Sequence, residues 1–575
     1  MLFKTISLTA ISSTALILSA CFVSNNTLPT TDTSRQAGLD WCFSNGPIYT
    51  ANNHKPIVDA LAVKNGQITY IGDKQDNLCE NFAGKKAQKI SLSGRALFPG
   101  FTDAHGHLIG IGLREMTLNL EGTTSIEELK ERLAKEVLKT PKGETIYGRG
   151  WIETHWPENR FPNRDDLDGV SPDHPVILER ADGHAVVVNS VALIKANVTN
   201  ETVSPFGGDI LKDDEARPTG MLIDRASDLV MGLTTKMTPE LKAHAYKTGA
   251  ALYARRGWTN IHSMSVDPSD VPIMETLAND NEIGIRVYNS LDSLKIMNVS
   301  DIKNVSPNQN PLITTRSIKL YSDGALGSRG AALLEPYDDN QDNDGLLLVT
   351  KEKTMPLLKQ ALIEGVQINT HAIGDRANRM VLDWYEEAMR DVPIESRRIA
   401  KPRWRIEHAQ ILNHADIPRF KELGVIASMQ PSHAIGDLHF APDRIGKERL
   451  AGGYAWRSLI DNGAIIAGGS DAPVEVGDPL IEFYAASMRK DLKGYSNDNW
   501  YLNEKVTRQE ALKMFTIWPA IAAFEDDKTG SLEVGKRADI TIFDQDIMTI
   551  DGPEILQTKA VMTIVDGKAV YSALP

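Results

Sequence analysis

The stretch Phe98-Pro99-Gly100-Phe101-Thr102-Asp103-Ala104-His105-Gly106-His107 sets the expectations for the rest of the chain. It has the pattern of a short buried strand that ends in two histidines one residue apart. Side chains at positions i and i+2 of a strand lie on the same side, so His105 and His107 can direct two imidazoles at one point. Neutral imidazole is the commonest metal ligand in proteins. An HxH pair alone is a weak signal, and the prediction of a metal site therefore depends on ligands at the ends of later strands.

The bulk composition is that of a globular protein. The chain has 575 residues, a length that favours one large and one small domain. Hydrophobic residues make up 42% and charged residues 24%, which is enough for a substantial core. The net charge of −14 and the lack of a run rich in Lys and Arg argue against a nucleic-acid partner.

The first 20 residues have the features of a secretory signal peptide. Lys4 precedes an apolar run from Ile6 to Leu18 that is too short for a lasting membrane span. The ending Leu18-Ser19-Ala20-Cys21 resembles a bacterial lipobox, and this resemblance implies that Cys21 becomes the lipidated first residue of the mature chain. Ordinary signal cleavage nearby is the alternative.

The segment after Cys21 indicates where the mature chain resides. Residues 21–37 are rich in Ser, Thr and Asn and are expected to form a flexible tether. Phe22 stands where the usual signal for inner-membrane retention has Asp. We therefore expect an exported protein in the cell envelope or periplasm, attached to the outer membrane only through its lipid.

Two cysteines remain if Cys21 carries lipid. An exported compartment is oxidising, so a disulfide between Cys42 and Cys79 is compatible with the sequence, and so are two buried thiols. No CxxC pattern or cysteine cluster suggests a structural zinc site.

The two ends of the chain have a similar pattern of short alternating strands. Residues 38–98 contain the turn signal Lys64-Asn65-Gly66, and residues 521–575 contain the turn Asp566-Gly567. We expect a small β-sandwich domain built from both ends, with a continuous domain inserted between them.

The middle of the chain, residues 99–520, alternates strand-like and helix-like segments. This alternation predicts an α/β fold with a parallel sheet, and eight strand candidates predict a closed (β/α)8 TIM barrel. About 150 residues separate the first candidate from the second, and we interpret residues 115–240 as an insertion or lid at the C-terminal face. The eight candidates are Ala96–His107, Thr259–Met264, Gly284–Ser290, Ser317–Asp323, Val366–His371, Trp404–His408, Val425–Gln430 and Ala464–Asp471.

Several of these strands end at a possible metal ligand. Lys319 lies within the apolar fourth strand, where a lysine is costly unless it is neutral or paired. The fifth strand ends at His371, the sixth at His408 and the eighth at Asp471. Four histidines and one carboxylate at the ends of barrel strands predict a metal centre.

These stretches resemble the amidohydrolase superfamily, and within it the amidohydrolase-3 group, which includes N-substituted formamide deformylases. The resemblance covers residues 40–573. The matching stretches are Pro99–His107, Arg180–His184, Pro218–Gly220, Lys319-Leu320 with Asp323-Gly324, His371–Asp375, Arg405–Gln410, Gly469–Pro473 and Gly535–Ile540.

The resemblance implies two divalent ions, zinc for these ligand types, held by six side chains. The two histidines of the first strand and the aspartate would hold the buried ion, and the other two histidines the second. Lys319 would bridge both ions after carbon dioxide converts it to a carbamate; a salt bridge to Asp323 or another carboxylate is the alternative. Iron, manganese and nickel are also compatible with the pattern. The six ligands are His105, His107, Lys319, His371, His408 and Asp471.

The implied reaction is hydrolysis of a C–N bond other than a peptide bond. Metal ions lower the pKa of a bridging water from about 15.7 to about 7, and Asp471 can pass the proton of the resulting hydroxide to the leaving nitrogen. We expect a small-molecule amide, N-substituted formamide or cyclic amide as substrate, and a homodimer by resemblance. The alternatives are a deaminase of a cyclic amidine, which Lys319 disfavours, and a solute-binding lipoprotein without catalysis.

Four further residues are candidates for the substrate side of the site. His184, in the insertion, is a candidate for a catalytic or substrate-binding role above the metals. His262 and His433 follow or end strands and are candidates to line the pocket, with core packing as the alternative. Asp323, at the end of the fourth strand, is a further candidate contact for the substrate.

Overall fold

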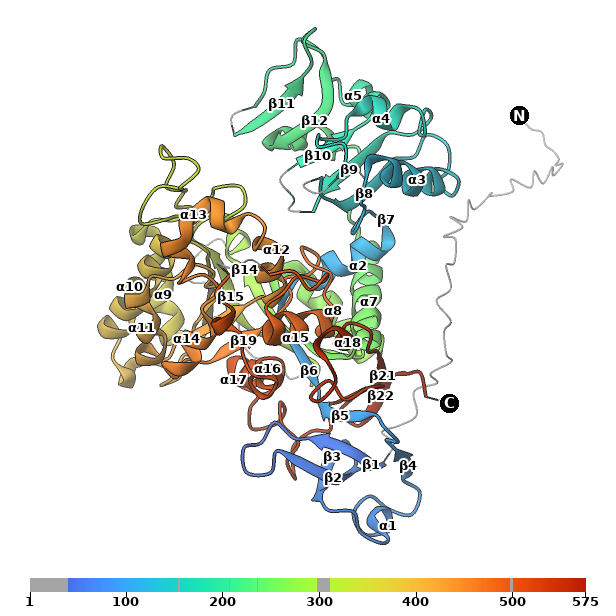
Figure 1. Cartoon of the computed structure of the whole chain (residues 1–575), viewed down its shortest axis with the longest axis vertical. Coiled ribbons are helices and arrows are strands. Elements are labelled where there is room, and N and C mark those ends of the chain that lie inside the picture. Colours follow the sequence, from blue (N-terminus) through green and yellow to red (C-terminus); the bar gives the residue numbers. More distant parts are fainter. Residues whose placement is uncertain are drawn as a thin grey trace, which may run out of the picture. The chain divides into compact units, whose positions relative to one another are not determined.

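The computed structural model describes residues 40–574 except 154–155, 182, 184, 206, 235, 297–310 and 497–499 (Figure 1). The predicted signal peptide and the whole predicted tether, which begins with Cys21, therefore lie outside the described residues, and so does His184. Among the helices of the described part, none combines the length and the apolar character that a bilayer crossing requires.

The middle of the chain forms the predicted parallel barrel. Its eight strands pair in the order β6-β13-β14-β15-β16-β17-β18-β19, which is the order of the sequence. The strands are β6 (Phe101–Gly106), β13 (Trp258–Val266), β14 (Arg286–Asp292), β15 (Ile313–Tyr321), β16 (Gln367–Ala372), β17 (Arg405–His408), β18 (Ile426–Met429) and β19 (Ile466–Gly468). The barrel is nearly closed, because the backbone N–H of Asp471, just after β19, donates to the His105 carbonyl of β6 at 2.6 Å.

The seam between β6 and β19 depends on a glycine and a buried carboxylate. A Cβ on Gly469 would meet the backbone nitrogen of His105 at 2.4 Å, so only glycine permits this approach. Asp103 accepts hydrogen bonds from the Ser470 backbone and hydroxyl and from the Tyr253 hydroxyl, at 2.5–2.9 Å. These contacts fix the ends of the first and last strands relative to each other.

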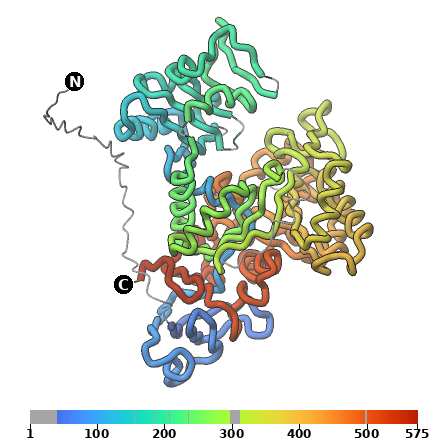
Figure 2. Tube along the Cα trace, turned by 180° about the vertical axis from the view of Figure 1, so that it is seen from behind, coloured from blue at the N-terminus to red at the C-terminus, as the bar shows by residue number. Residues whose placement is uncertain are grey.

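Helices surround the barrel strands, as the view from behind also shows (Figure 2). The longest, α7, begins at Pro239 after Thr238, whose hydroxyl accepts from the Leu241 N–H and caps the helix. Gly112 of α2 allows α7 to pack closely, since a Cβ there would meet the Ala245 carbonyl at 1.8 Å. The barrel helices are α2 (Leu108–Met116), α7 (Pro239–Arg256), α8 (Val271–Asn279), α9 (Lys351–Glu364), α10 (Asp375–Asp391), α11 (Ile417–Leu423), α12 (Pro431–Asp437), α13 (Ala441–Leu450), α14 (Trp456–Asp461), α15 (Pro479–Met488), α16 (Arg508–Met514) and α17 (Ile517–Ala522).

The stretch Ala96–His107, expected to be one strand, forms two strands in different sheets. Residues Ala96–Pro99 form β5 of the terminal sheet, and β6 of the barrel starts after Gly100. His107 follows β6 as the residue that precedes α2. Every residue of both strands is buried, so the apolar pattern continues across the change of sheet and gives no sign of it.

The β-sandwich expected from both chain ends takes the form of one curled sheet. The strands pair in the order β22-β21-β20-β5-β1-β2-β3, with β4 beside β1, and Figures 1 and 2 show N-terminal and C-terminal strands side by side. Ile68 of β3 hydrogen-bonds to Gly535 and Lys536, which precede β20, so the sheet curls around its own apolar core. The elements are β1 (Trp41–Tyr49), β2 (Ile57–Lys64), β3 (Gln67–Gly72), α1 (Leu78–Phe82), β4 (Gln88–Ser91), β5 (Ala96–Pro99), β20 (Ile540–Phe543), α18 (Gly552–Ile555), β21 (Ala560–Val565) and β22 (Lys568–Ser572).

A disulfide joins two elements of this sheet domain. Cys42 of β1 and Cys79 of α1 are bonded, with their Cα atoms 5.7 Å apart. Of the two possibilities that the sequence left open, the structure has the disulfide.

The long insertion between α2 and α7 has its own sheet and cores. Its six strands pair in the order β11-β12-β10-β9-β8-β7. Trp151 and Trp156 are buried in one of its cores, so they are packing residues. The elements are β7 (Leu118–Asn119), α3 (Ile126–Val137), β8 (Ile146–Trp151), α4 (Arg164–Asp168), β9 (Val176–Arg180), β10 (Ala185–Val188), α5 (Ser190–Lys195), β11 (Gly208–Lys212), β12 (Pro218–Asp224) and α6 (Asp228–Met231).

The insertion starts beside the loop that follows the last barrel strand. Arg114 of α2 donates to the carbonyls of Glu475 and Val476, four and five residues after Asp471, and lies 3.1 Å from the Glu121 carboxylate. The start of the insertion is thereby attached to the loop that follows the last barrel strand.

Candidate metal centre

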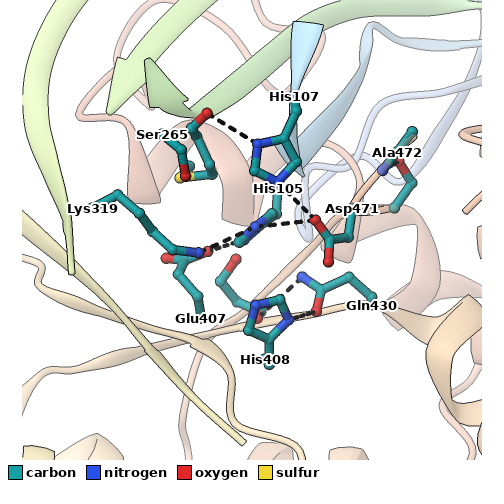
Figure 3. Close-up of polar contacts among 12 residues, drawn as sticks. His105, His107, Ser265, Lys319, Glu407, His408, Gln430, Asp471 and Ala472 are labelled. Atoms are coloured by element: carbon teal, nitrogen blue, oxygen red, sulfur yellow. Dashed lines mark hydrogen bonds and ion pairs between the residues drawn. The ribbon is translucent and has the colours of Figure 1, made fainter. Parts of the chain in front are cut away.

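The predicted ligands from distant parts of the chain meet at the C-terminal ends of the barrel strands (Figure 3). One ligand atom each from His105, His408 and Asp471 lies within 4.8 Å of the other two, and all three residues are buried. Imidazole nitrogens and carboxylate oxygens are the ligands that zinc takes in catalytic sites. The residues present therefore fit a divalent metal ion.

His105 is held by a carboxylate behind it. Its Nδ1 lies 2.6 Å from Glu407 Oε2, and its Nε2 faces Asp471 Oδ1 at 3.4 Å. Glu407 is paired in turn with Arg405 at 2.7 Å, and the side chains of His105, Glu407 and Arg405 are at most 1% exposed. A carboxylate behind a ligating histidine fixes its tautomer and orientation. Sequence reasoning missed Glu407, although two opposite charges two residues apart in an apolar strand were a usable signal.

His107 faces the same oxygen of Asp471 as His105 does. Its Nε2 lies 3.0 Å from Asp471 Oδ1, and its Nδ1 lies 3.1 Å from the Met264 carbonyl. A carbonyl oxygen only accepts hydrogen bonds, so Nδ1 carries the proton and Nε2 is free to bind a metal ion.

His408 has a side-chain amide behind it. The Gln430 Oε1 lies 2.8 Å from His408 Nδ1, so Nε2 is again the nitrogen left for a ligand. The backbone of His408 and of Ala409 has positive φ, 73° and 43°, which non-glycine residues rarely adopt and which is concentrated at functional sites. Gln430 ends the predicted seventh strand, but no role was predicted for it.

His371 lies next to His408, with their ring centres 4.5 Å apart. Its Nε2 is 3.4 Å from Asp323 Oδ1, and within the described residues this nitrogen forms no hydrogen bond. Asp323 accepts backbone N–H groups from three residues, and burial raises the pKa of its carboxyl to about 7. The structure thus places Asp323 behind His371; its contact with a substrate stays a prediction.

Lys319 is buried beside His105. Its Nζ lies 3.4 Å from His105 Nε2 and 5.6 Å from the centre of the Tyr321 ring. Burial lowers the pKa of Lys319 to about 8, which increases the share of neutral amine near pH 7. In the part of the chain that the structure describes, Lys319 forms no ion pair with Asp323 or with another carboxylate, which was the alternative considered above.

The electrostatics of the site suit a cation. Burial lowers the pKa of His105 to about 4, that of His371 to about 3 and that of His408 well below its usual value. Burial alone would raise the pKa of Asp471, but the adjacent histidines, His105 first, lower it well below its usual range. At neutral pH the site therefore presents neutral imidazoles and an ionised carboxylate, the forms that bind metal.

The two remaining histidine candidates lie in different surroundings. His433 of α12 borders the site, with its Nε2 3.6 Å from Asp471 Oδ2 and without a hydrogen bond in the described structure. His262 is fully buried in the barrel, where its Nδ1 accepts from Arg405 at 2.8 Å and its ring lies against Tyr288. This is a core-packing arrangement, so only His433 directly adjoins the predicted ligands.

Comparison with known proteins identifies the family. A model of the amidohydrolase family matches residues 88–571 of this chain. The chain belongs to the amidohydrolase family. YtcJ of Bacillus subtilis (strain 168), a putative amidohydrolase, is 30% identical over 531 residues, which span 92% of this chain and 98% of YtcJ.

Two further similarities concern an enzyme and a solved structure. The N-substituted formamide deformylase of Arthrobacter pascens is 25% identical to this amidohydrolase over 554 residues, 92% of this chain and 98% of the deformylase. The crystal structure of an uncharacterised metal-dependent hydrolase from Pyrococcus horikoshii OT3 matches with a TM-score of 0.72 and 26% identity, covering 89% of this chain and 99% of that one. The predicted family is confirmed, and these similarities support a metal-dependent hydrolase.

Proposed function

We propose that this amidohydrolase uses divalent metal ions, zinc for these ligands, to hydrolyse the C–N bond of a small amide, N-substituted formamide or cyclic amide. One observation carries the proposal. Asp471 Oδ1 faces two imidazoles, 3.0 Å from His107 Nε2 and 3.4 Å from His105 Nε2, within a buried cluster of metal-ligand type. The similarity to a formamide deformylase supports an amide-type substrate.

Six side chains would hold the ions, as the family resemblance implies. Ions bound there would supply a Lewis acid for the amide carbonyl and a more acidic water. Lys319 would contribute two oxygen ligands after its neutral amine adds to carbon dioxide and releases a proton. The lowered pKa of Lys319, about 8 because of burial, favours the amine form that this addition needs. The six residues are His105, His107, Lys319, His371, His408 and Asp471.

Asp471 is the residue best placed to move protons. Its Oδ1 faces the two histidines, whereas its Oδ2 is the oxygen on the side of His433, at 3.6 Å. With a pKa well below its usual range because of the adjacent histidines, the carboxylate is ionised at neutral pH. It can accept a proton from the attacking water at Oδ2 and return it to the leaving nitrogen.

The test is a substrate panel on the zinc-loaded protein. The panel has four substrates, each of which tests one reaction. An N-alkylformamide tests deformylation, and an N-acyl amino acid tests deacylation. A cyclic amide tests ring opening, and a cyclic amidine tests deamination. We expect zinc-dependent release of an amine from an amide, lost in Asp471→Asn and retained in Asp280→Asn, a control at an exposed helix end. Ammonia release from the amidine alone would indicate a deaminase. Zinc binding without turnover of any amide would indicate the solute-binding alternative.

We also propose that the mature chain is exported and attached to the cell envelope by a lipid on Cys21. The lipobox-like ending before Cys21 supports this proposal. The Cys42–Cys79 disulfide supports it independently, because disulfides persist in oxidising compartments and are rare in the bacterial cytosol.

A further inference from the structure

Strand β13 contains an extra residue beside the site. Ser263 pairs with Asn289 of β14 and Val266 pairs with Leu291, so three steps along β13 match two along β14. Ser265, inside this bulge, has φ 57°, a left-handed conformation that serine rarely adopts. Bulges next to active sites change the direction of backbone or side-chain groups.

The bulge presents a carbonyl to His107. The carbonyl oxygen of Met264, the residue before Ser265, lies 3.1 Å from His107 Nδ1. His107 stands outside β6, and its backbone N–H donates to the Ala472 carbonyl at 2.8 Å. This bond holds the backbone of His107 but does not fix the rotation of its ring, which depends on the contacts of the side chain. The contact with Met264 therefore sets both the ring orientation and the proton on Nδ1, and leaves Nε2 directed at Asp471.

A side chain from the next strand but one holds the bulge. The Tyr321 hydroxyl, at the end of β15, donates to Ser265 Oγ at 2.6 Å. Tyr321 is itself anchored, because β15 pairs with β14 and β16 on its two sides.

We propose that Tyr321 is a positioning residue for the metal ligand His107. Its hydrogen bond holds Ser265 in the left-handed conformation, and this conformation holds the Met264 carbonyl against the imidazole. The inference rests on the proposed function, in which His107 binds a metal ion. It makes Tyr321 and Ser265 determinants of metal affinity although neither is a ligand.

The test measures zinc affinity of the metal-free protein by competition with a chromophoric chelator. Tyr321→Phe and Ser265→Ala break the same hydrogen bond from its two ends, and each should weaken zinc binding about tenfold, as loss of an outer-shell contact does. Ser265→Gly should bind within about threefold of the wild type, because glycine adopts positive φ without help. Ser265→Gly combined with Tyr321→Phe should therefore recover most of the loss seen in Tyr321→Phe.

A matched control is Tyr288→Phe, which removes a buried hydroxyl bonded to Gln367 in the same barrel at 2.9 Å. It should leave zinc affinity unchanged, and urea unfolding shows whether each variant is folded. Wild-type affinity in both Tyr321→Phe and Ser265→Ala would overturn the proposal. The proposal would also be overturned if Ser265→Gly combined with Tyr321→Phe bound zinc as weakly as Tyr321→Phe alone. The Tyr321 hydroxyl would then affect zinc binding without acting through Ser265. If the wild type itself binds no zinc, the proposed function fails, which is a separate result.

Discussion

His105 Nδ1 lies 2.6 Å from Glu407 Oε2, and the two side chains are buried side by side in the barrel. Arg405 donates to both oxygens of Glu407, at 2.7 and 2.8 Å, and to the Ala104 carbonyl of β6. This network joins the sixth strand of the barrel to the first. It fixes the predicted ligand His105 in the orientation in which Nε2 faces Asp471.

Glu407→Gln should lower both stability and zinc affinity. The variant leaves Arg405 buried without its opposite charge, and breaking a buried pair in this way costs about 3–5 kcal/mol. Zinc affinity should fall about 10- to 100-fold because the imidazole loses its carboxylate partner. Urea unfolding of the metal-free protein and chelator competition measure the two effects. Glu422→Gln, at an exposed position of α11, is the control, and wild-type zinc affinity in Glu407→Gln would contradict this account.

Lys319→Met should stabilise the metal-free protein. Burial lowers the pKa of Lys319 from 10.5 to about 8 in the folded chain, so the unfolded chain binds more protons between these values. The stability of the metal-free wild type therefore rises with pH from about 8 to 10.5 and is lowest below pH 8. At pH 7 the variant should be more stable by about 3 kcal/mol, and the difference should shrink toward pH 10. Urea unfolding of both proteins at pH 7 and pH 10 tests this, and a destabilised variant at pH 7 would refute it.

With metal present, Lys319→Met should be harmful, because it should lower zinc content and activity. Lys319→Met removes the side chain proposed to bridge the ions, so zinc content should fall from about two ions per chain to about one, and amide hydrolysis should be lost. Elemental analysis gives the stoichiometry. Lys568→Met, at an exposed strand position, should keep wild-type content. Full zinc content in Lys319→Met would exclude a bridging role for this lysine.

The disulfide should contribute to the stability of the sheet domain. It links residues 37 apart in sequence, and closing a loop of this length is worth about 2–4 kcal/mol in the chain-entropy view. Cys42→Ser with Cys79→Ser should therefore unfold at lower urea concentration, and added reductant should shift the wild type to the same midpoint. An unchanged midpoint under reducing conditions would show that the bond is absent in solution.

Cys21→Ser should release the protein from the membrane fraction. Without the thiol no lipid can be attached, so the chain should appear in the soluble part of the envelope. Mass spectrometry of the N-terminal peptide of the wild type should show an acylated Cys21. An unmodified N-terminus that starts at another residue would contradict the lipid anchor and indicate ordinary signal cleavage.

The sequence was sufficient to predict the barrel and the position of the candidate ligands at its strand ends, whose binding of metal stays a prediction. Short buried runs that end in histidine, such as those at His105 and His408, are local patterns and can be recognised in a single sequence. The split of Ala96–His107 at Gly100 could not be predicted, because a fully buried run has the same pattern whether it stays in one sheet or passes to another.

The contacts behind the ligands were much harder to predict. Glu407 contacts His105, which lies about three hundred positions earlier in the sequence, and Gln430 contacts His408 from the neighbouring strand. Only the folded barrel brings these pairs together. The bulge at Ser265 leaves no mark in the composition of β13. His262 has the same strand-end position in the sequence as the predicted ligands, yet its ring lies against Arg405 in the barrel interior.

The most direct test of the central claim is anomalous diffraction at the zinc edge from crystals of the zinc-loaded protein. We predict a peak bonded to His105 Nε2, His107 Nε2 and Asp471, at about 2.0–2.2 Å, and a second peak at His371 and His408. A zinc ion bound elsewhere, with the side chains of His105 and Asp471 left without metal, would contradict the account.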